Sequence, residues 1–207
     1  AVATGMFEDL YIGDYWTIDG VNYRIAAFDY YLGTGDIECT THHIIVVPDN
    51  QLYPYAMNDT DTTEGGYYGS KLRTSGLDDA KVMVAAAFGS GHIFNHREYL
   101  INATTNGRAV GGIWSTCTVE LMSEVMVYGH NVFSPMNIGE VNSYNWTNCK
   151  VQLPLFCFRH DLICNRENFW LRDAVSSARF AYSNKDGSPD FRNASYVYGV
   201  RPEIPVS

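Results

Sequence analysis

The chain has 207 residues, enough for one sizeable domain, and 46% of them are hydrophobic, which is typical of a globular protein and not of a disordered one. Its 14 basic and 23 acidic residues give a formal net charge of −9. We therefore expect no nucleic-acid partner, because neutralising phosphates needs a basic surface, and no membrane insertion, because no apolar run is long enough to span a bilayer.

The first half of the chain carries signals for a hairpin and a third strand. Residues 14–29, DYWTIDGVNYRIAAFD, alternate apolar and polar side chains around Asp19-Gly20, which predicts a β-hairpin. Residues 41–49, THHIIVVPD, predict a strand that stops at Pro48. Residues 51–73 have the composition of a loop, with a short helix near residues 70–73.

The clearest helix signal lies in TSGLDDAKVMVAAAFGS, residues 74–90. Ser75 is placed to cap its N-terminus, Asp78 and Asp79 suit the first turn, and Gly89 is placed to end it. Further strands are predicted at REYLINA (97–103) and AVGGIWSTCTV (109–119). The next segment, VELMSEVMVYG, is ambiguous and is compatible with a strand that runs into a short helix capped by Ser123.

The last forty residues again alternate between apolar and polar side chains. We predict strands in NFWLRDAV (168–175), ARFAYS (178–183) and DFRNASYVYGVRPEI (190–204), with a turn at residues 185–187. Several short strands with one or two helices indicate an α+β fold. The sequence has no internal repeat or linker, so we expect one domain.

A search for catalytic and metal-binding chemistry gives weak signals. His92 and His96 have a spacing that would suit two ligands on one helix, but the residues between and before them do not predict a helix. We expect these histidines, with His42 and His43, to be hydrogen-bonded polar groups, and we expect no metal ligands and no cofactor. No nucleophile elbow, phosphate-binding loop or dinucleotide fingerprint is present, so we expect no catalytic residue.

The chain has five cysteines and no CxxC pair. We expect mostly reduced thiols with at most one or two bridges among Cys39, Cys117, Cys149, Cys157 and Cys164. Cys157 and Cys164 lie near His160 in the sequence, which alone is no evidence of a catalytic pair, and buried cysteine as a small apolar residue is the commoner role.

The strongest functional signal is compositional. Residues 178–203, ARFAYSNKDGSPDFRNASYVYGVRPE, are rich in Tyr, Phe, Asn, Ser, Asp and Arg. Tyrosine gives a large contact area with few rotamers to lose, and Ser, Asn and Asp give adaptable hydrogen bonds, as in antibody combining sites. The alternative is a solvated hairpin whose aromatic rings are half-buried against the core.

These residues carry a family resemblance. The pattern FWLRDAVSSARFAY…DG…NASYVYGVRPEI resembles the C-terminal module of the variable proteins that retroelements diversify, which have a C-type-lectin-like fold. Upstream, YWTIDGVNYRIAAFDYY, MNDTDTTEGGYYGSKLRT and ELMSEVMVYG are similar to the body of such phage and gut-bacterial proteins. The resemblance extends from about Tyr15 to Ile204, and its WLRD and GVRP motifs are moderately specific.

The resemblance implies a fold, a domain division and a function. The implied fold is a C-type-lectin-like α+β fold of short antiparallel strands, with residues 1–14 as a lead-in segment, residues 15–207 as the domain and a variable region at about 178–203. The implied function is that of a non-enzymatic receptor-binding protein. It would lie on a phage tail or head fibre, or on a bacterial cell surface, bind a protein or glycan on a bacterial surface, and form a homotrimer or other homo-oligomer.

The resemblance also assigns residues. Trp170, Leu171, Val175, Val200 and Pro202 would be framework, while Arg172, Asp173 and Arg201 would hold the base of the site. Retroelement diversification of Asn codons at their adenines yields the residue types seen here except at Lys185, which departs from it. The expected contact residues are Arg179, Tyr182, Asn184, Lys185, Asp186, Ser188, Asp190, Phe191, Arg192, Tyr196 and Tyr198.

Two other functions remain open at this point. One is a structural virion component, such as a capsid decoration or fibre subunit, whose lectin-like face packs against neighbouring subunits. The other is an enzyme of the formylglycine-generating type, which shares the lectin-like core but needs a pair of active-site cysteines that we cannot place. The EPN, QPD and WND triplets of calcium-dependent lectins are absent, so the fold does not imply calcium-dependent sugar binding.

Overall fold

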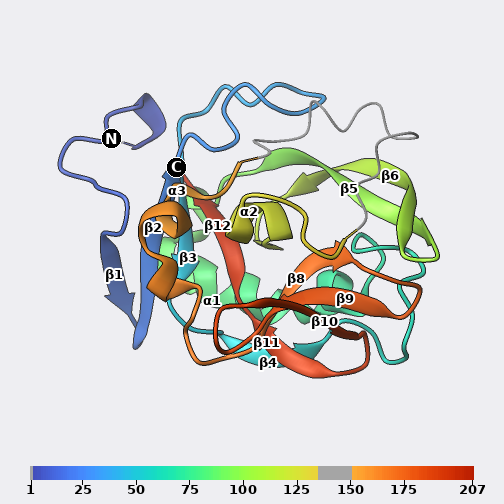
Figure 1. The fold of residues 1–207 in the computed structure, drawn as a ribbon. Helices are drawn as coiled ribbons and strands as arrows, with labels where there is room; N and C mark the ends of the chain where they lie inside the picture. Colours follow the sequence, from blue (N-terminus) through green and yellow to red (C-terminus); the bar gives the residue numbers. More distant parts are fainter. Residues whose placement is uncertain (1, 135–150) are drawn as a thin grey trace.

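A computed structural model describes residues 2–134 and 151–207 of the chain (Figure 1). These residues form a mixed α+β structure in which nearly all neighbouring strands are antiparallel and helices are few. The α+β class expected from the sequence is confirmed. None of the helices described is both long enough and apolar enough to cross a membrane.

The first sheet has five strands in the order β1-β2-β3-β12-β7, and every neighbouring pair is antiparallel. Its strands are β1 (Tyr15–Ile18), β2 (Val21–Phe28), β3 (Ile44–Pro48), β12 (Pro202–Val206) and β7 (Glu120–Leu121). The predicted hairpin around Asp19-Gly20 is present, and both turn residues have positive φ, 49° and 79°. Strand β12 lies inside the sheet, and all its residues are buried.

The second sheet also has five strands, in the order β10-β9-β8-β11-β4. They are β10 (Pro189–Asn193), β9 (Arg179–Ser183), β8 (Phe169–Ala174), β11 (Val197–Val200) and β4 (Tyr53–Ala56), and only the β8–β11 pair is parallel. Strand β4 corrects the sequence prediction of a loop. It tolerates Pro54 because it lies at the edge of the sheet, where a missing N–H need not break the ladder.

Strands β5 (His96–Thr105) and β6 (Arg108–Cys117) confirm the two strands predicted there, and they pair as a separate two-stranded ribbon. The turn between them is Asn106-Gly107, with φ of 50° and 77°. A Cβ on Gly107 would lie 2.2 Å from the Cα of Ser176, so a larger residue would collide with the backbone. This contact ties the ribbon to the loop between β8 and β9.

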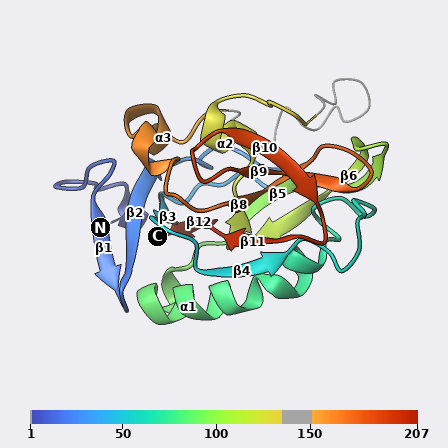
Figure 2. The same ribbon diagram turned by 60° about the horizontal axis from the view of Figure 1, so that its bottom comes forward.

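The helices are α1 (Asp78–Phe88), α2 (Glu124–Tyr128) and α3 (Pro154–Phe158), with short helical turns η1 (Val2–Thr4), η2 (Leu72–Gly76), η3 (Ser90–His92) and η5 (His160–Leu162). Figure 2 shows α1 along one side of the molecule, next to β4. Gly89 ends α1 as predicted, and Ser123 caps α2 by accepting a bond from the Met126 N–H at 3.2 Å.

The predicted cap at Ser75 is wrong. The π-helical turn η2 leads directly into α1, so Ser75 lies inside a continuous helical path and has no free helix start to cap. Its hydroxyl instead donates to the carbonyl of Lys71 at 3.0 Å. Helix α3 was not predicted, because its five residues are too few to show a helical period.

Residues 2–14, expected to be a lead-in segment, pack against the first sheet. The ring of Phe7 lies 4.8 Å from that of Phe28 on β2, and the Gly13 N–H donates to the Ile25 carbonyl.

The core occupies both faces of the first sheet. On β3, Ile44 and Val46 join one buried cluster, while Ile45 and Val47 join another on the opposite face. The second sheet contributes to both clusters, with Trp170 in the first and neighbouring residues of β8 in the second. Continuous apolar runs such as IIVV follow from this two-sided burial.

Candidate functional site

The segment expected to bind a ligand forms strands β9, β10 and β11 of the second sheet. In the β9–β10 pair Asp190 lies opposite Tyr182, and Asn193 lies opposite Arg179. Because side chains alternate across a strand, residues of even number on β9 and β10 lie on one face of the sheet and those of odd number on the other. The predicted contact residues are therefore divided between two faces.

One face carries aromatic rings whose exposed fraction increases from the core to the surface. We call this surface the tyrosine face, and it consists of Tyr182, Asp190, Arg192, Tyr196 and Tyr198. The ring of Tyr198 lies 5.0 Å from that of Trp170 and 4.5 Å from that of Tyr182. Exposure rises from 0% at Trp170 through 5% at Tyr182 to 44% at Tyr196. The buried rings thus form a rigid base for the exposed one.

Polar contacts complete the tyrosine face. The hydroxyl of Tyr182 donates to the Asp190 carboxylate at 2.8 Å, and burial, with this bond, raises the pKa of Tyr182. The guanidinium of Arg192 lies 4.3 Å from the centre of the Tyr196 ring, in a cation–π contact. Tyr182 therefore supports Asp190, while the exposed Arg192 and Tyr196 offer surface to a partner.

The opposite face carries Arg179 and Phe191. The Phe191 ring lies 5.1 Å from that of Phe133, which follows α2, and the Arg179 guanidinium lies 5.4 Å from the Phe191 ring. Arg179 also donates to the side chain of Asn193 at 3.0 Å. Phe133 was missed by the sequence reasoning, since nothing in its neighbourhood signals contact with a strand almost sixty positions later.

The turn between β9 and β10 holds four further predicted contact residues: Asn184, Lys185, Asp186 and Ser188. The Asp186 carboxylate accepts bonds from the Ser188 N–H at 2.9 Å and from its hydroxyl at 2.6 Å, and these bonds lower the pKa of Asp186. Gly187 has φ of 84°, which the predicted turn requires. The turn is ordered by its own bonds, at the end of the strands away from Arg179.

A carboxylate from a distant loop fixes the other end of the site. Asp61 accepts bonds from the Asn193 amide at 2.7 Å and from the Ser195 hydroxyl at 2.6 Å. The bonds to Ser195 and Asn193 lower the pKa of Asp61. The sequence gives no signal for this role of Asp61, because its partners lie more than 130 positions away.

Arg172, Asp173 and Arg201, which we expected at the base of the site, form hydrogen bonds in the interior of the protein. Arg172 donates to Glu98 at 2.7 Å, and the Asp173 carboxylate accepts from the Glu124 N–H at 2.6 Å. Arg201 is fully buried and donates to the Pro48 carbonyl at 2.8 Å. The expected framework residues Trp170, Leu171, Val200 and Pro202 are buried, and Val175 is half-buried.

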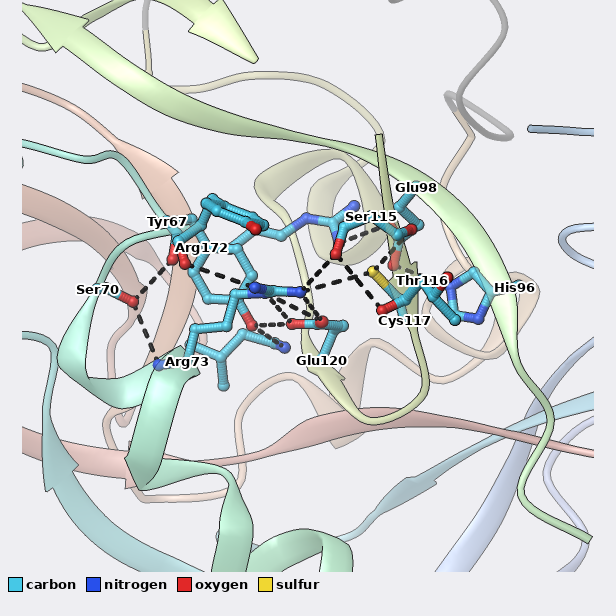
Figure 3. Close-up of polar contacts among 12 residues, drawn as sticks. Tyr67, Ser70, Arg73, His96, Glu98, Ser115, Thr116, Cys117, Glu120 and Arg172 are labelled. Atoms are coloured by element: carbon cyan, nitrogen blue, oxygen red, sulfur yellow. Dashed lines mark hydrogen bonds and ion pairs between the residues drawn. The ribbon is translucent and has the colours of Figure 1, made fainter. Parts of the chain in front are cut away.

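A buried charge network lies beneath ribbon β5–β6 (Figure 3). Its first part centres on Glu120, which accepts bonds from the Tyr67 hydroxyl at 2.7 Å and from the Arg73 guanidinium at 3.1 Å. Arg73 also donates to the Ser115 hydroxyl on β6 at 3.1 Å. Burial, then the Glu120 charge, raises the pKa of Tyr67 well above its ordinary value.

The second part of the buried charge network centres on Glu98. Its carboxylate is bonded to Arg172 at 2.7 Å and to the His96 Nε2 at 2.9 Å. Burial alone would raise the pKa of Glu98, but Arg172 and His96 hold it below its ordinary value. Next to it, Glu203 accepts from the Tyr31 hydroxyl at 2.8 Å.

The cysteines and histidines weighed for catalysis lie apart. The Cys157 thiol is bonded to Gln152, and the Cys164 thiol to the carbonyl of Lys185, so neither partner is His160. Cys39, Cys117, Cys157 and Cys164 are free thiols, and Cys157 and Cys164 are exposed, not buried as expected. Cys149 lies outside the described residues. His92 lies on η3 and His96 on β5, so they share no helix.

No protein-family model matches the chain, and no significant match is found to a curated protein or to a solved structure.

Proposed function

We propose that this protein is a non-enzymatic binding protein with a C-type-lectin-like fold, diversified by a retroelement and displayed on a phage particle. Its ligand is a protein or glycan on a bacterial surface. The observation that carries the proposal is the tyrosine face, on which exposed Tyr196 and Arg192 stand over rings that are buried in the core. Tyrosine and arginine are the residue types that dominate binding energy at interfaces.

The hydrogen bonds that order the candidate site before it binds a partner also support the proposal. Asp61 fixes the segment between β10 and β11, Asp186 fixes the β9–β10 turn, and Tyr182 positions Asp190. A surface that is already ordered loses less conformational entropy when it binds. Arg192 and Tyr196 remain replaceable, because they are exposed and the buried framework ring of Trp170 contacts Tyr182 and Tyr198 instead.

Substitution on the tyrosine face tests the proposal. We would label the chain fluorescently and measure its binding to intact cells of a panel of bacterial strains by flow cytometry. The double variant Arg192→Ala, Tyr196→Ala is expected to lose at least about tenfold in cell binding, with little change in melting temperature. Val82→Ala is the matched control, since Val82 is 69% exposed on α1 and lies outside the tyrosine face.

Loss of binding by the control, or full binding by the double variant, would reject the tyrosine face as the contact surface. The retroelement itself is tested in the neighbouring DNA. A near-copy of the coding segment for residues 178–203, differing at template adenines and adjacent to a reverse transcriptase gene, is the expected finding.

A structural role in the virion is favoured by a second surface. Strand β1 is an edge strand of the first sheet, and its Tyr15 and Trp16 are 54% and 37% exposed, near Tyr11 at 66%. Exposed aromatic side chains on an edge strand suit contact with another subunit. Light scattering of the purified chain, with Trp16→Lys as the variant, distinguishes the two roles, because only an assembly that uses β1 should dissociate.

A further inference from the structure

Three buried side chains of the charge network converge on one point. His96 and Glu98 on β5 and Glu203 on β12 each place a ligand-type atom within 4.8 Å of the other two. All three residues are buried, with exposures of 3%, 0% and 0%. They come from strands of different sheets, so the fold, and not local sequence, brings them together.

Two atoms at this point lack hydrogen-bond partners. The Nδ1 of His96 and the Oε2 of Glu203 are fully buried and have no partner among the described residues. A buried polar atom that is left unpaired costs free energy, and buried carboxylates are normally paired with a cation or bound to a metal. The unpaired oxygen of Glu203 is therefore a metal-ligand atom that no described residue engages.

We propose that His96, Glu98 and Glu203 bind one divalent transition-metal cation of the zinc class. One imidazole nitrogen with two carboxylate oxygens suits zinc or manganese, whereas calcium prefers six to eight oxygen ligands. His96 Nε2 and Glu98 Oε1 are 2.9 Å apart, a hydrogen-bond distance. A tetrahedral ion with bonds of about 2.1 Å would place them about 3.4 Å apart, so binding needs only a small movement and replaces this hydrogen bond.

The surroundings hold these ligands in place. Arg172 donates to Glu98 Oε2 at 2.7 Å, and the Tyr31 hydroxyl donates to Glu203 Oε1 at 2.8 Å. The Tyr31 ring stacks on the His96 ring, with their centres 3.8 Å apart. Hydrogen bonds of this kind set the orientation of metal ligands in proteins, and here both carboxylates have one, while the His96 ring is held by stacking.

The surface has a hollow next to His96. It has a volume of about 160 Å³ and is lined by His96 itself and by surface residues that include Glu38 and Thr41. A hollow of this volume is large enough for water molecules, which would complete the coordination of an ion held by three protein ligands. The three residues lie on β5 and β12 and not on the strands of the tyrosine face. The bound ion would therefore link two strands of the framework, and it would not contact the bacterial-surface partner of the proposed function.

Metal binding to the intact chain is the direct test. The purified chain is stripped with a chelator and titrated with Zn²⁺, Mn²⁺, Ca²⁺ and Co²⁺. We expect about one zinc per chain by elemental analysis, a rise in melting temperature with Zn²⁺ but not with Ca²⁺, and visible absorption bands with Co²⁺. A stripped wild-type chain that shows no zinc retention and no Co²⁺ bands would overturn the proposal without any variant.

Matched variants locate the ion. Glu203→Gln keeps the size of the side chain and an acceptor for Tyr31, so it should fold, and it should weaken Co²⁺ and Zn²⁺ binding by about 100-fold or more. His92→Gln and Glu38→Gln are controls, because His92 is an exposed histidine and Glu38 is exposed at the hollow without being a ligand. Unchanged binding in Glu203→Gln, or loss of binding in a control, would place the ion elsewhere and overturn the proposal.

Discussion

The tyrosine face and the buried charge network use the same types of side chain in opposite settings. Both pair a tyrosine hydroxyl with a carboxylate, Tyr182 with Asp190 on the face and Tyr67 with Glu120 in the network. Both contain an arginine, but Arg192 is exposed while Arg172 is bonded to fully buried Glu98. Where solvent reaches these groups they are available to a partner, and where it does not they fix the fold.

The largest predicted difference concerns the two arginines. Arg172→Ala would leave the Glu98 carboxylate buried without its main cation, and should lower the free energy of unfolding by about 3–5 kcal/mol. Urea denaturation measures this loss, and Arg192→Ala is the matched control, with an expected change within about 0.5 kcal/mol. Equal effects of the two substitutions would remove the distinction between network and face.

A pH series tests Asp173, the neighbour of Arg172 in the sequence. Desolvation, and then the nearby Glu124 carboxylate, raises the pKa of Asp173 to about 7. The folded state therefore holds this proton more tightly than the unfolded state, so the contribution of Asp173 to stability falls as pH rises from about 4 to 7 and is constant above that.

Asp173→Asn keeps the acceptor for the Glu124 N–H and removes the titration. The melting temperature of the variant minus that of the wild type should rise by about 5 °C between pH 5 and pH 8. A difference that does not change with pH would show that Asp173 is ionised throughout.

A smaller effect is predicted inside the tyrosine face. Tyr182→Phe removes the bond to Asp190, whose other atoms are partly solvated, and should cost about 1 kcal/mol in urea denaturation. Tyr11→Phe, at a residue that is 66% exposed, serves as the control and should cost nothing measurable. A cost for Tyr182→Phe as large as that for Arg172→Ala would mean that the face belongs to the core.

The smallest effect on stability is expected at Tyr196, the most exposed ring of the tyrosine face. Tyr196→Ala should change the free energy of unfolding by less than about 0.5 kcal/mol, because the ring is 44% exposed and contacts the exposed Arg192 and, at 6.4 Å between ring centres, Tyr198. Thermal melts measure the change. A loss above about 2 kcal/mol would show that Tyr196 supports the fold.

Local signals predicted the elements that are determined locally. Asp19-Gly20 predicted its hairpin and Ser123 its cap, because positive φ and a side-chain acceptor act within a few residues. Strand β4 was missed, since Pro54 and two tyrosines have the composition of a loop and become a strand only by pairing with β11. The prediction of a helix cap at Ser75 was wrong because the sequence gives no signal for the π-helical turn that precedes α1.

The candidate site was predictable in composition but not in geometry. The sequence identified the segment and its turn, and alternation from that turn would have shown that Tyr182 and Phe191 lie on opposite faces. Asp61 and Phe133 were beyond reach, because their contacts depend on how distant segments pack. The cluster of His96, Glu98 and Glu203 was missed for the same reason, since only the fold places β5 beside β12.

The position of β12 has a consequence for the diversification that we propose. This strand fills the gap between β3 and β7, yet it is synthesised after the segment that carries the tyrosine face. A substitution in that segment leaves β12 intact, whereas a shift of reading frame there replaces it and leaves the first sheet divided. If the segment is diversified as proposed, the order of the strands would favour products with substitutions over products with a shifted reading frame, which could not complete the first sheet.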